Sequence, residues 1–244
     1  MRMERYIRFY LIVALVFALM CVSFANSTKT LTADTVLYPR GGNTAVAFKA
    51  GTTVELDNRG QVISGVIAHD TVFYPQGGNT AIAFQAGTVV NFSERGQVVS
   101  GVIAHDTVFY PQGGNTAIAF KVGTRVNFSQ RGQVISGVIA HDTVFYPQGG
   151  NTAIAFQVGT VVNFSERGQV VTGVIAHDTV LYPQGGNTAI AFRGGTTVTF
   201  SERGQVVTGV LARDTVLFRQ GANTASTFKG GTTVTFNTRG QVVG

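Results

Sequence analysis

Apolar and polar positions alternate in short runs along this chain, and the pattern recurs every 36 residues. From residue 65 onward, four runs rich in Val, Ile, Phe and Thr cover 71–74, 80–84, 88–92 and 97–104, the last of which crosses into the next repeat, and Pro, Gly, Asn and Ser separate them. Runs of about four to eight residues bounded by such turn-forming residues are typical of β-strands. No segment after residue 25 has a helical period, so the sequence predicts an all-β protein.

Alternation within the predicted strands separates two faces. In the run 80–84, Ile82 and Phe84 share one side, and only Ala81 and Ala83 occupy the other. The run 88–92 repeats this arrangement, with bulky apolar side chains on one side and mixed residues on the other. A strand with one bulky apolar face belongs to a layer that has the core on one side only.

The repeated unit fills nearly all of the chain, so we interpret 26–244 as a single β-repeat domain. The middle four copies are nearly identical, and the first and last diverge from them. The copies, numbered 1 to 6 below, span 29–64, 65–100, 101–136, 137–172, 173–208 and 209–244.

A copy of four short strands cannot bury its own apolar face, so neighbouring copies have to stack. One possible architecture is an open, elongated β-solenoid, and the alternative is a closed six-bladed β-propeller. The end copies distinguish the two. The usual His becomes Ala33 and Arg213, and the usual Pro becomes Arg219. Divergent end copies are expected for the caps of an open array, so we favour the open stack.

The segments 90–98 and 101–107, which read VNFSERGQV and GVIAHDT, resemble a repeat of largely uncharacterised exported bacterial proteins. They are more remotely similar to hairpin repeats of the MORN type. The resemblance extends over every copy. It implies a stacked β-hairpin architecture and no defined activity.

The N-terminus has the layout of a secretory signal: a basic start, an apolar run over 9–24, and small residues at Ser23 and Ala25. We predict a signal peptide over 1–25, cleaved after Ala25, and a secreted or cell-surface protein with no stable membrane span. The alternative is a retained membrane anchor, because the run is almost long enough to span a bilayer. Cleavage would remove Cys21, the single cysteine, and with it any disulfide or zinc–thiolate site.

The net charge and the composition limit the classes of partner that the protein is expected to bind. Loss of 1–25 takes away three Arg and one Glu, which lowers the formal net charge from +6 to +4. The remaining basic residues form no cluster, so a nucleic-acid partner is not expected. Charged residues make up only 12% of the chain, against about 25% in a typical soluble domain. A weakly charged surface tolerates close association with other chains.

Reactive-looking residues recur in columns, one per copy. The His-Asp pairs allow a metal ladder if the copies bring several together. Asp is retained as Asp34 and Asp214 where the His is lost, however, so we interpret the Asp as a turn cap. Near-identical copies do not build one asymmetric catalytic site, and no nucleophile motif is present. We therefore expect no enzyme, no cofactor and no metal. The pairs are His69-Asp70, His105-Asp106, His141-Asp142 and His177-Asp178.

Two further columns are candidate ligand-facing ladders. Arg occurs in all six copies in a turn just before Gly, where it either contacts an anionic surface or solubilises the edge and blocks unwanted strand pairing. A Tyr column lies beside the Pro-Gln-Gly-Gly-Asn loop, and is either a buried aromatic stack or an exposed sugar-stacking face. The Arg ladder is Arg59, Arg95, Arg131, Arg167, Arg203 and Arg239, and the Tyr ladder is Tyr38, Tyr74, Tyr110, Tyr146 and Tyr182, ending in Phe218.

These features lead to a hypothesis of a non-catalytic extracellular scaffold for surface or matrix adhesion or self-association. The alternative is a lectin-like module with one carbohydrate site per copy. Many weak identical contacts gain from effective concentration in either case. Exposure of the Tyr column favours the carbohydrate-binding module, and its burial favours the scaffold.

Overall fold

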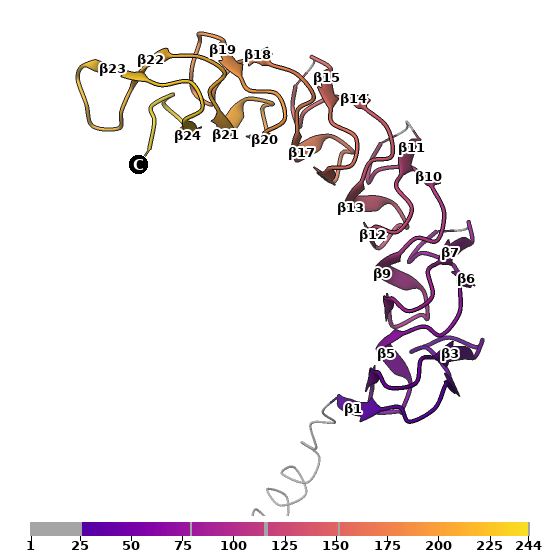
Figure 1. Ribbon diagram of the computed structural model, residues 1–244. Coiled ribbons are helices and arrows are strands. Elements are labelled where there is room, and N and C mark those ends of the chain that lie inside the picture. The colour runs from indigo at the N-terminus through magenta and orange to yellow at the C-terminus, as the bar shows by residue number, and fades with distance from the viewer. Residues whose placement is uncertain (1–25, 79, 115–116, 151, 244) are drawn as a thin grey trace, which may run out of the picture.

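The computed structural model describes residues 26–78, 80–114, 117–150 and 152–243, and every regular element in them is a β-strand. The predicted signal peptide lies outside these residues. No helix in the described part of the chain is long and apolar enough to cross a membrane. Two layers are present: a continuous antiparallel sheet, and a row of short hairpins beside it (Figure 1).

The continuous sheet has 12 strands, and all of its pairings are antiparallel. Copies 1 to 5 contribute two strands each; the first strand begins just before copy 1 and ends within it, and the last is the single sheet strand of copy 6. In spatial order the strands are β1 (Ser27–Thr30), β4 (Thr53–Leu56), β5 (Val62–Val66), β8 (Val89–Phe92), β9 (Val98–Val102), β12 (Arg125–Phe128), β13 (Val134–Val138), β16 (Val161–Phe164), β17 (Val170–Val174), β20 (Thr197–Phe200), β21 (Val206–Val210) and β24 (Thr233–Thr235).

The second layer consists of six two-stranded hairpins, one per copy. They are β2 (Thr35–Leu37) with β3 (Val46–Phe48), β6 (Thr71–Phe73) with β7 (Ile82–Phe84), β10 (Thr107–Phe109) with β11 (Ile118–Phe120), β14 (Thr143–Phe145) with β15 (Ile154–Phe156), β18 (Thr179–Leu181) with β19 (Ile190–Phe192), and β22 (Thr215–Phe218) with β23 (Ala225–Phe228).

The array is open, as predicted, and the closed propeller is wrong. The copies follow an arc, with the long sheet on its concave side and the hairpins on its convex side (Figure 1). The sheet ends at β1 and β24, which do not pair with each other. The four-strand pattern is also confirmed in copies 1 to 5, whereas the described part of copy 6 has three strands. The fourth strand is shorter than the run 97–104, because the Ala104 N–H leaves the sheet and donates to the Ala83 carbonyl at 2.9 Å.

The core lies between the two layers. Ile82, Phe84, Val90 and Phe92 are all buried, whereas Ala81 is exposed, so the predicted faces are confirmed. Aromatic rings connect successive copies. Within copy 2, the Phe73 ring packs against both Phe84 and Phe92. The Phe84 ring also packs edge-on against Phe128 of copy 3, with the ring centroids 6.4 Å apart. Edge-to-face packing of this kind adds to the hydrophobic stabilisation of the stack.

Glycines in the sheet make room for these rings. A Cβ added to Gly101 would lie 2.6 Å from Cδ1 of Phe84, which is too close for any side chain. The same contact recurs between Gly137 and Phe120 at 2.6 Å. The Gly in each fourth strand is therefore required by the packing of the Phe column.

The last copy ends the aromatic stack differently. Phe228 stands where Phe84 stands in copy 2, but among the described residues it has no following Phe ring beside it. Instead, the guanidinium of Arg219 lies 4.7 Å from its ring centroid, in a cation–π contact. Arg219 replaces the Pro that the other copies have at this position. The substitution therefore places a cation against the Phe228 ring at the end of the array.

Candidate functional site

The Asp of each His-Asp pair caps a turn, as predicted. Asp106 Oδ1 accepts the N–H of Val122 at 2.6 Å, and the hydroxyl of the neighbouring Thr107 donates to the His105 carbonyl at 2.7 Å. The same cap occurs in all six copies, with distances from 2.6 to 2.9 Å. Each cap joins the start of the outer hairpin to the turn that follows it. The Asp column is therefore a structural feature.

The His residues are exposed and remain on separate copies. Within the described ranges, no group of three or more His, Cys, Asp or Glu side chains is arranged to hold a metal ion. At the end of the array, the Lys229 ammonium lies 2.7 Å from Asp214. Its hydrogen bond, assisted by the N–H of Gly230, holds the pKa of Asp214 below its ordinary value.

We expect Asp106→Ala to lower the free energy of unfolding by about 1 kcal/mol, because it removes one backbone-capping hydrogen bond. Asp106→Asn retains an acceptor oxygen and should lose less. His105→Ala, one position away and exposed, is the control and should be nearly neutral. Urea unfolding followed by circular dichroism measures all three. Equal losses for Asp106→Ala and His105→Ala would contradict the capping role.

The Tyr ladder is exposed on the convex side. Tyr38, Tyr74, Tyr110, Tyr146 and Tyr182 have 54 to 57% of their surface accessible, and Phe218 has 51%. Each Tyr directly follows the first strand of a hairpin. Its backbone is fixed, because the Tyr74 carbonyl accepts the N–H of Val98 at 2.9 Å and the next residue, Pro75, is buried. The ring itself points to solvent beside an equally exposed Val72, so each copy presents an aromatic and an aliphatic side chain together.

The Arg ladder lies in the turns that join pairs of sheet strands. The Ser93 hydroxyl accepts the N–H groups of Arg95 and Gln97, both at 3.3 Å, and so shapes the turn between β8 and β9. All six Arg side chains are exposed. Among the described residues their guanidinium groups make no hydrogen bond or ion pair, so their donors are available to a ligand.

Close docking of two turns brings the ladders together at each junction between copies. The N–H of Gly113 donates to Gln133 Oε1 within copy 3 at 3.1 Å. The opposite side of Gly113 faces the next copy, where a Cβ would lie 2.1 Å from the Glu166 carbonyl oxygen. The turn before Arg167 thus seats directly on the Gly-Gly turn of copy 3. Because the backbones touch, Arg167 lies beside the hairpin of its own copy and the loop of the preceding one.

The result is a groove at the junction between two copies, which we call the junction groove. At copies 3 and 4, one wall comes from copy 4 and the other from copy 3. Copy 4 contributes Val144, Tyr146, Arg167 and Gln169, and copy 3 contributes Pro111, Gly113, Gly114 and Ile118. Its volume is about 430 Å³. The equivalent groove at copies 1 and 2 has a volume of about 350 Å³, and is lined by Tyr74, Val72, Arg95 and Gln97 against Pro39 and Gly42. Both volumes lie in the range of small-molecule sites, about 300–1,000 Å³.

A polar hollow lies on the other side of each of these Arg side chains. Arg95 borders one together with Gln76, Glu94 and Gln130, and Arg167 borders one with Gln148, Glu166 and Glu202. Each Arg therefore separates an aromatic groove from a polar one. The grooves offer an aromatic face, a cation and amide groups, which suit a ligand with apolar faces and polar rims. Among the described residues that line the grooves, no nucleophile is hydrogen-bonded to a His ring or another activating base.

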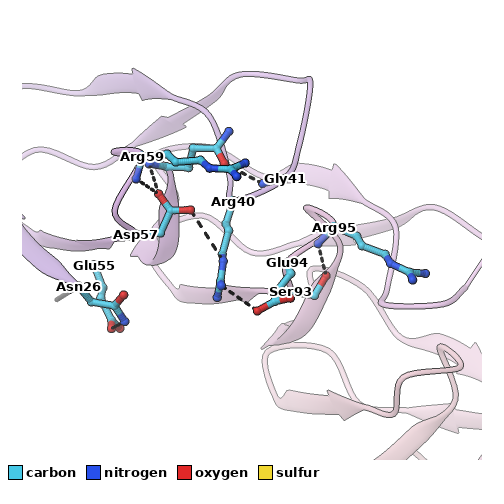
Figure 2. Close-up of polar contacts among 10 residues, drawn as sticks. Asn26, Arg40, Gly41, Glu55, Asp57, Arg59, Ser93, Glu94 and Arg95 are labelled. Carbon is cyan, nitrogen blue, oxygen red and sulfur yellow. Dashed lines mark hydrogen bonds and ion pairs between the residues drawn. The ribbon is translucent and has the colours of Figure 1, made fainter. Parts of the chain in front are cut away.

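Arg40 is a site residue that the sequence analysis missed. It donates to Glu94 at 2.8 Å across the first junction and lies 3.8 Å from Asp57 in its own copy (Figure 2). Asp57 is only 9% exposed and also accepts the N–H groups of Arg59 and Gln61. The signal was available in the sequence, because Arg40 stands where the other copies have Gln.

Comparisons with known proteins give no family for this chain. No family model matches it, and no curated protein matches it. Among solved structures, it is similar to the crystal structure of a protein of unknown function from Bacteroides caccae. The two share 12% identity, the match covers 85% of this chain and 90% of that one, and the TM-score is 0.19.

Proposed function

We propose that this protein is a non-catalytic, multivalent carbohydrate-binding scaffold that acts outside the cell. The observation that carries the proposal is the junction groove, in which an exposed Tyr and an unpaired Arg from one copy face the Gly-Gly loop of the copy before it. Six copies leave five junctions, so the same small site is available several times on one face.

The chemistry of the groove suits a sugar. The C–H face of a pyranose ring packs on an aromatic ring, while the Tyr hydroxyl remains available to a polar partner. Arg and Gln supply hydrogen-bond donors for ring substituents. The backbone of each Tyr is fixed, so ligand binding costs only the rotamer freedom of the side chain and no ordering of the loop. Exposure of the Tyr column was the criterion that separated the two hypotheses from sequence, and it favours the carbohydrate-binding module.

The proposal keeps one part of the scaffold hypothesis, namely multivalent attachment to a surface. Individual grooves are shallow, and each would bind weakly. Several grooves on one stiff array raise the overall affinity without any new contact, provided that one ligand or one surface reaches them together. Adhesion to a polysaccharide-coated surface is the process that this arrangement supports.

The test is glycan binding by the purified protein and by a variant with Tyr74, Tyr110 and Tyr146 all changed to Ala. We expect the variant to lose at least tenfold in affinity on a glycan array and in calorimetry, while its circular dichroism stays unchanged because the rings are exposed. The matched control changes the exposed His69, His105 and His141 to Ala and should bind normally. Failure of the unmodified protein to bind any glycan, or equal binding by the Tyr variant, would refute the proposal.

A further inference from the structure

We infer that the ligand of the junction grooves is a linear, carboxylate-bearing polysaccharide that lies along the array, with one disaccharide at each copy. This inference rests on the proposed function and goes further, because it specifies the charge, the shape and the direction of the ligand. Three observations carry it: the continuity of the hollows, the sign of the free charge beside them, and their spacing.

The hollows form a track along the array. Arg95 borders the aromatic groove between copies 1 and 2, and it also borders the polar hollow, which extends to Gln130 of copy 3. Arg167 likewise borders the groove between copies 3 and 4 and the polar hollow that reaches Glu202 of copy 5. Arg95 and Arg167 thus each join an aromatic groove to the next polar hollow, and the two sets cover copies 1 to 3 and copies 3 to 5. A ligand that occupies them in turn is a chain molecule running parallel to the row of hairpins.

A free guanidinium is present in every copy along this track, whereas carboxylates without a partner among the described residues border the two polar hollows only as Glu166 and Glu202, both beside Arg167. The residue before each Arg is acidic in three copies only, as Glu94, Glu166 and Glu202, and is Asn58, Gln130 or Thr238 in the others. At the first junction Glu94 is already engaged by Arg40 at 2.8 Å. The six Asp caps are occupied by backbone N–H groups. A planar guanidinium with free donors binds a carboxylate in a bidentate manner.

The spacing of the grooves suits a disaccharide. Copies 1 to 5 each add two strands to the long sheet, and adjacent strands are ~4.8 Å apart, so the copies repeat every ~9.6 Å along the sheet. The hairpins lie on the convex side of the arc (Figure 1), so neighbouring hairpins are slightly farther apart than neighbouring copies of the sheet. This spacing is close to the length of one disaccharide in an extended glycan. A uronate in every disaccharide therefore meets one Arg per copy.

The first experiment measures affinity against ligand length. The probes are size-defined fragments of hyaluronan, alginate and oligogalacturonate, from one to six disaccharides, with neutral chito-oligosaccharides of the same lengths. We expect the affinity for at least one uronate series to increase with each disaccharide until the array is spanned. The overall gain should be on the order of 10²- to 10⁴-fold. It should weaken as salt is added, and the neutral series should bind more weakly at every length.

The second experiment changes Arg95, Arg131 and Arg167 to Gln. This variant should lose most of the salt-dependent affinity for the uronate series. Its affinity for the neutral series should fall much less, because Gln keeps an amide N–H donor but carries no charge. The control changes three exposed basic residues outside the grooves, Lys121, Arg193 and Arg213, to Gln. It alters the net charge equally and should retain tight binding.

The outcomes separate the two proposals. If no oligosaccharide of either kind binds, the proposed function fails and this inference fails with it. If sugars bind but the affinity does not depend on length or on the uronate, the function stands and this inference is overturned. Tighter binding of single-stranded oligothymidylate than of any uronate fragment would also overturn it, because the track would then be reading a nucleic-acid backbone.

Discussion

Replacing Gly113 by Ala should lower the free energy of unfolding by about 2–5 kcal/mol, from strain in a left-handed backbone plus overpacking at the junction. Gly113 has φ of +72°, and its missing side chain leaves the space that the Glu166 carbonyl of the next copy occupies, 2.1 Å from an added Cβ. The clash is with backbone, which cannot rotate away. The junction between copies 3 and 4 therefore has to open or shift.

Gly123 provides the matched control for this variant. Its φ is also +72°, but the nearest atom to an added Cβ is Gln85 Oε1 at 3.8 Å, at the end of a flexible side chain. Gly123→Ala should therefore show only the backbone strain, about 1–2 kcal/mol. Urea unfolding of both variants isolates the docking contact as the difference between them. Equal losses would mean that the turns do not dock as described.

Changing Phe120 to Ala should cost about 3–5 kcal/mol, because it leaves a cavity in the middle of the aromatic stack. The Phe120 ring is fully buried, with its centroid 5.8 Å from that of Phe109 and 6.4 Å from that of Phe164 in the next copy. Val108→Ala is the control. Its side chain is 61% exposed on the convex side, and the loss should stay within about 0.5 kcal/mol.

The location of the damage is a second readout for Phe120→Ala. In a stacked array each copy contacts only its neighbours, so stability is close to a sum of copy and junction contributions. Amide hydrogen exchange should show lost protection in copies 3 and 4 and much less change in copies 1 and 6. Uniform loss of protection along the whole chain would indicate a single cooperative unit instead.

Much of the fold could be predicted from sequence because local chemistry determines it. The Gly, Pro and Asn positions mark the turns, and retention of Asp34 and Asp214 without the His pointed to the cap that the structure shows. The exposure of the Tyr column could not be read in the same way. Val72, Phe73 and Tyr74 are all apolar, so alternation did not reveal that Phe73 faces the core while its neighbours face solvent.

The candidate site was out of reach of sequence for a different reason. Arg167 and Gly113 are far apart in the chain and belong to different copies, and only the seating of one turn on another brings them together. A repeat shows which residues recur, but the register between copies is set by packing. The Arg and Tyr ladders were therefore identified as two separate columns, and the structure combines them in one groove.

The junction between copies has a consequence for how such a protein changes length. Every interior junction uses the same Gly-Gly turn, the same Phe column and the same strand pairing. An in-frame gain or loss of one 36-residue copy therefore creates no new interface and leaves the end copies as they are. Unequal recombination within the gene can thus lengthen or shorten the array without creating a new kind of junction, so the length of the protein becomes a heritable quantity that varies in steps of one copy.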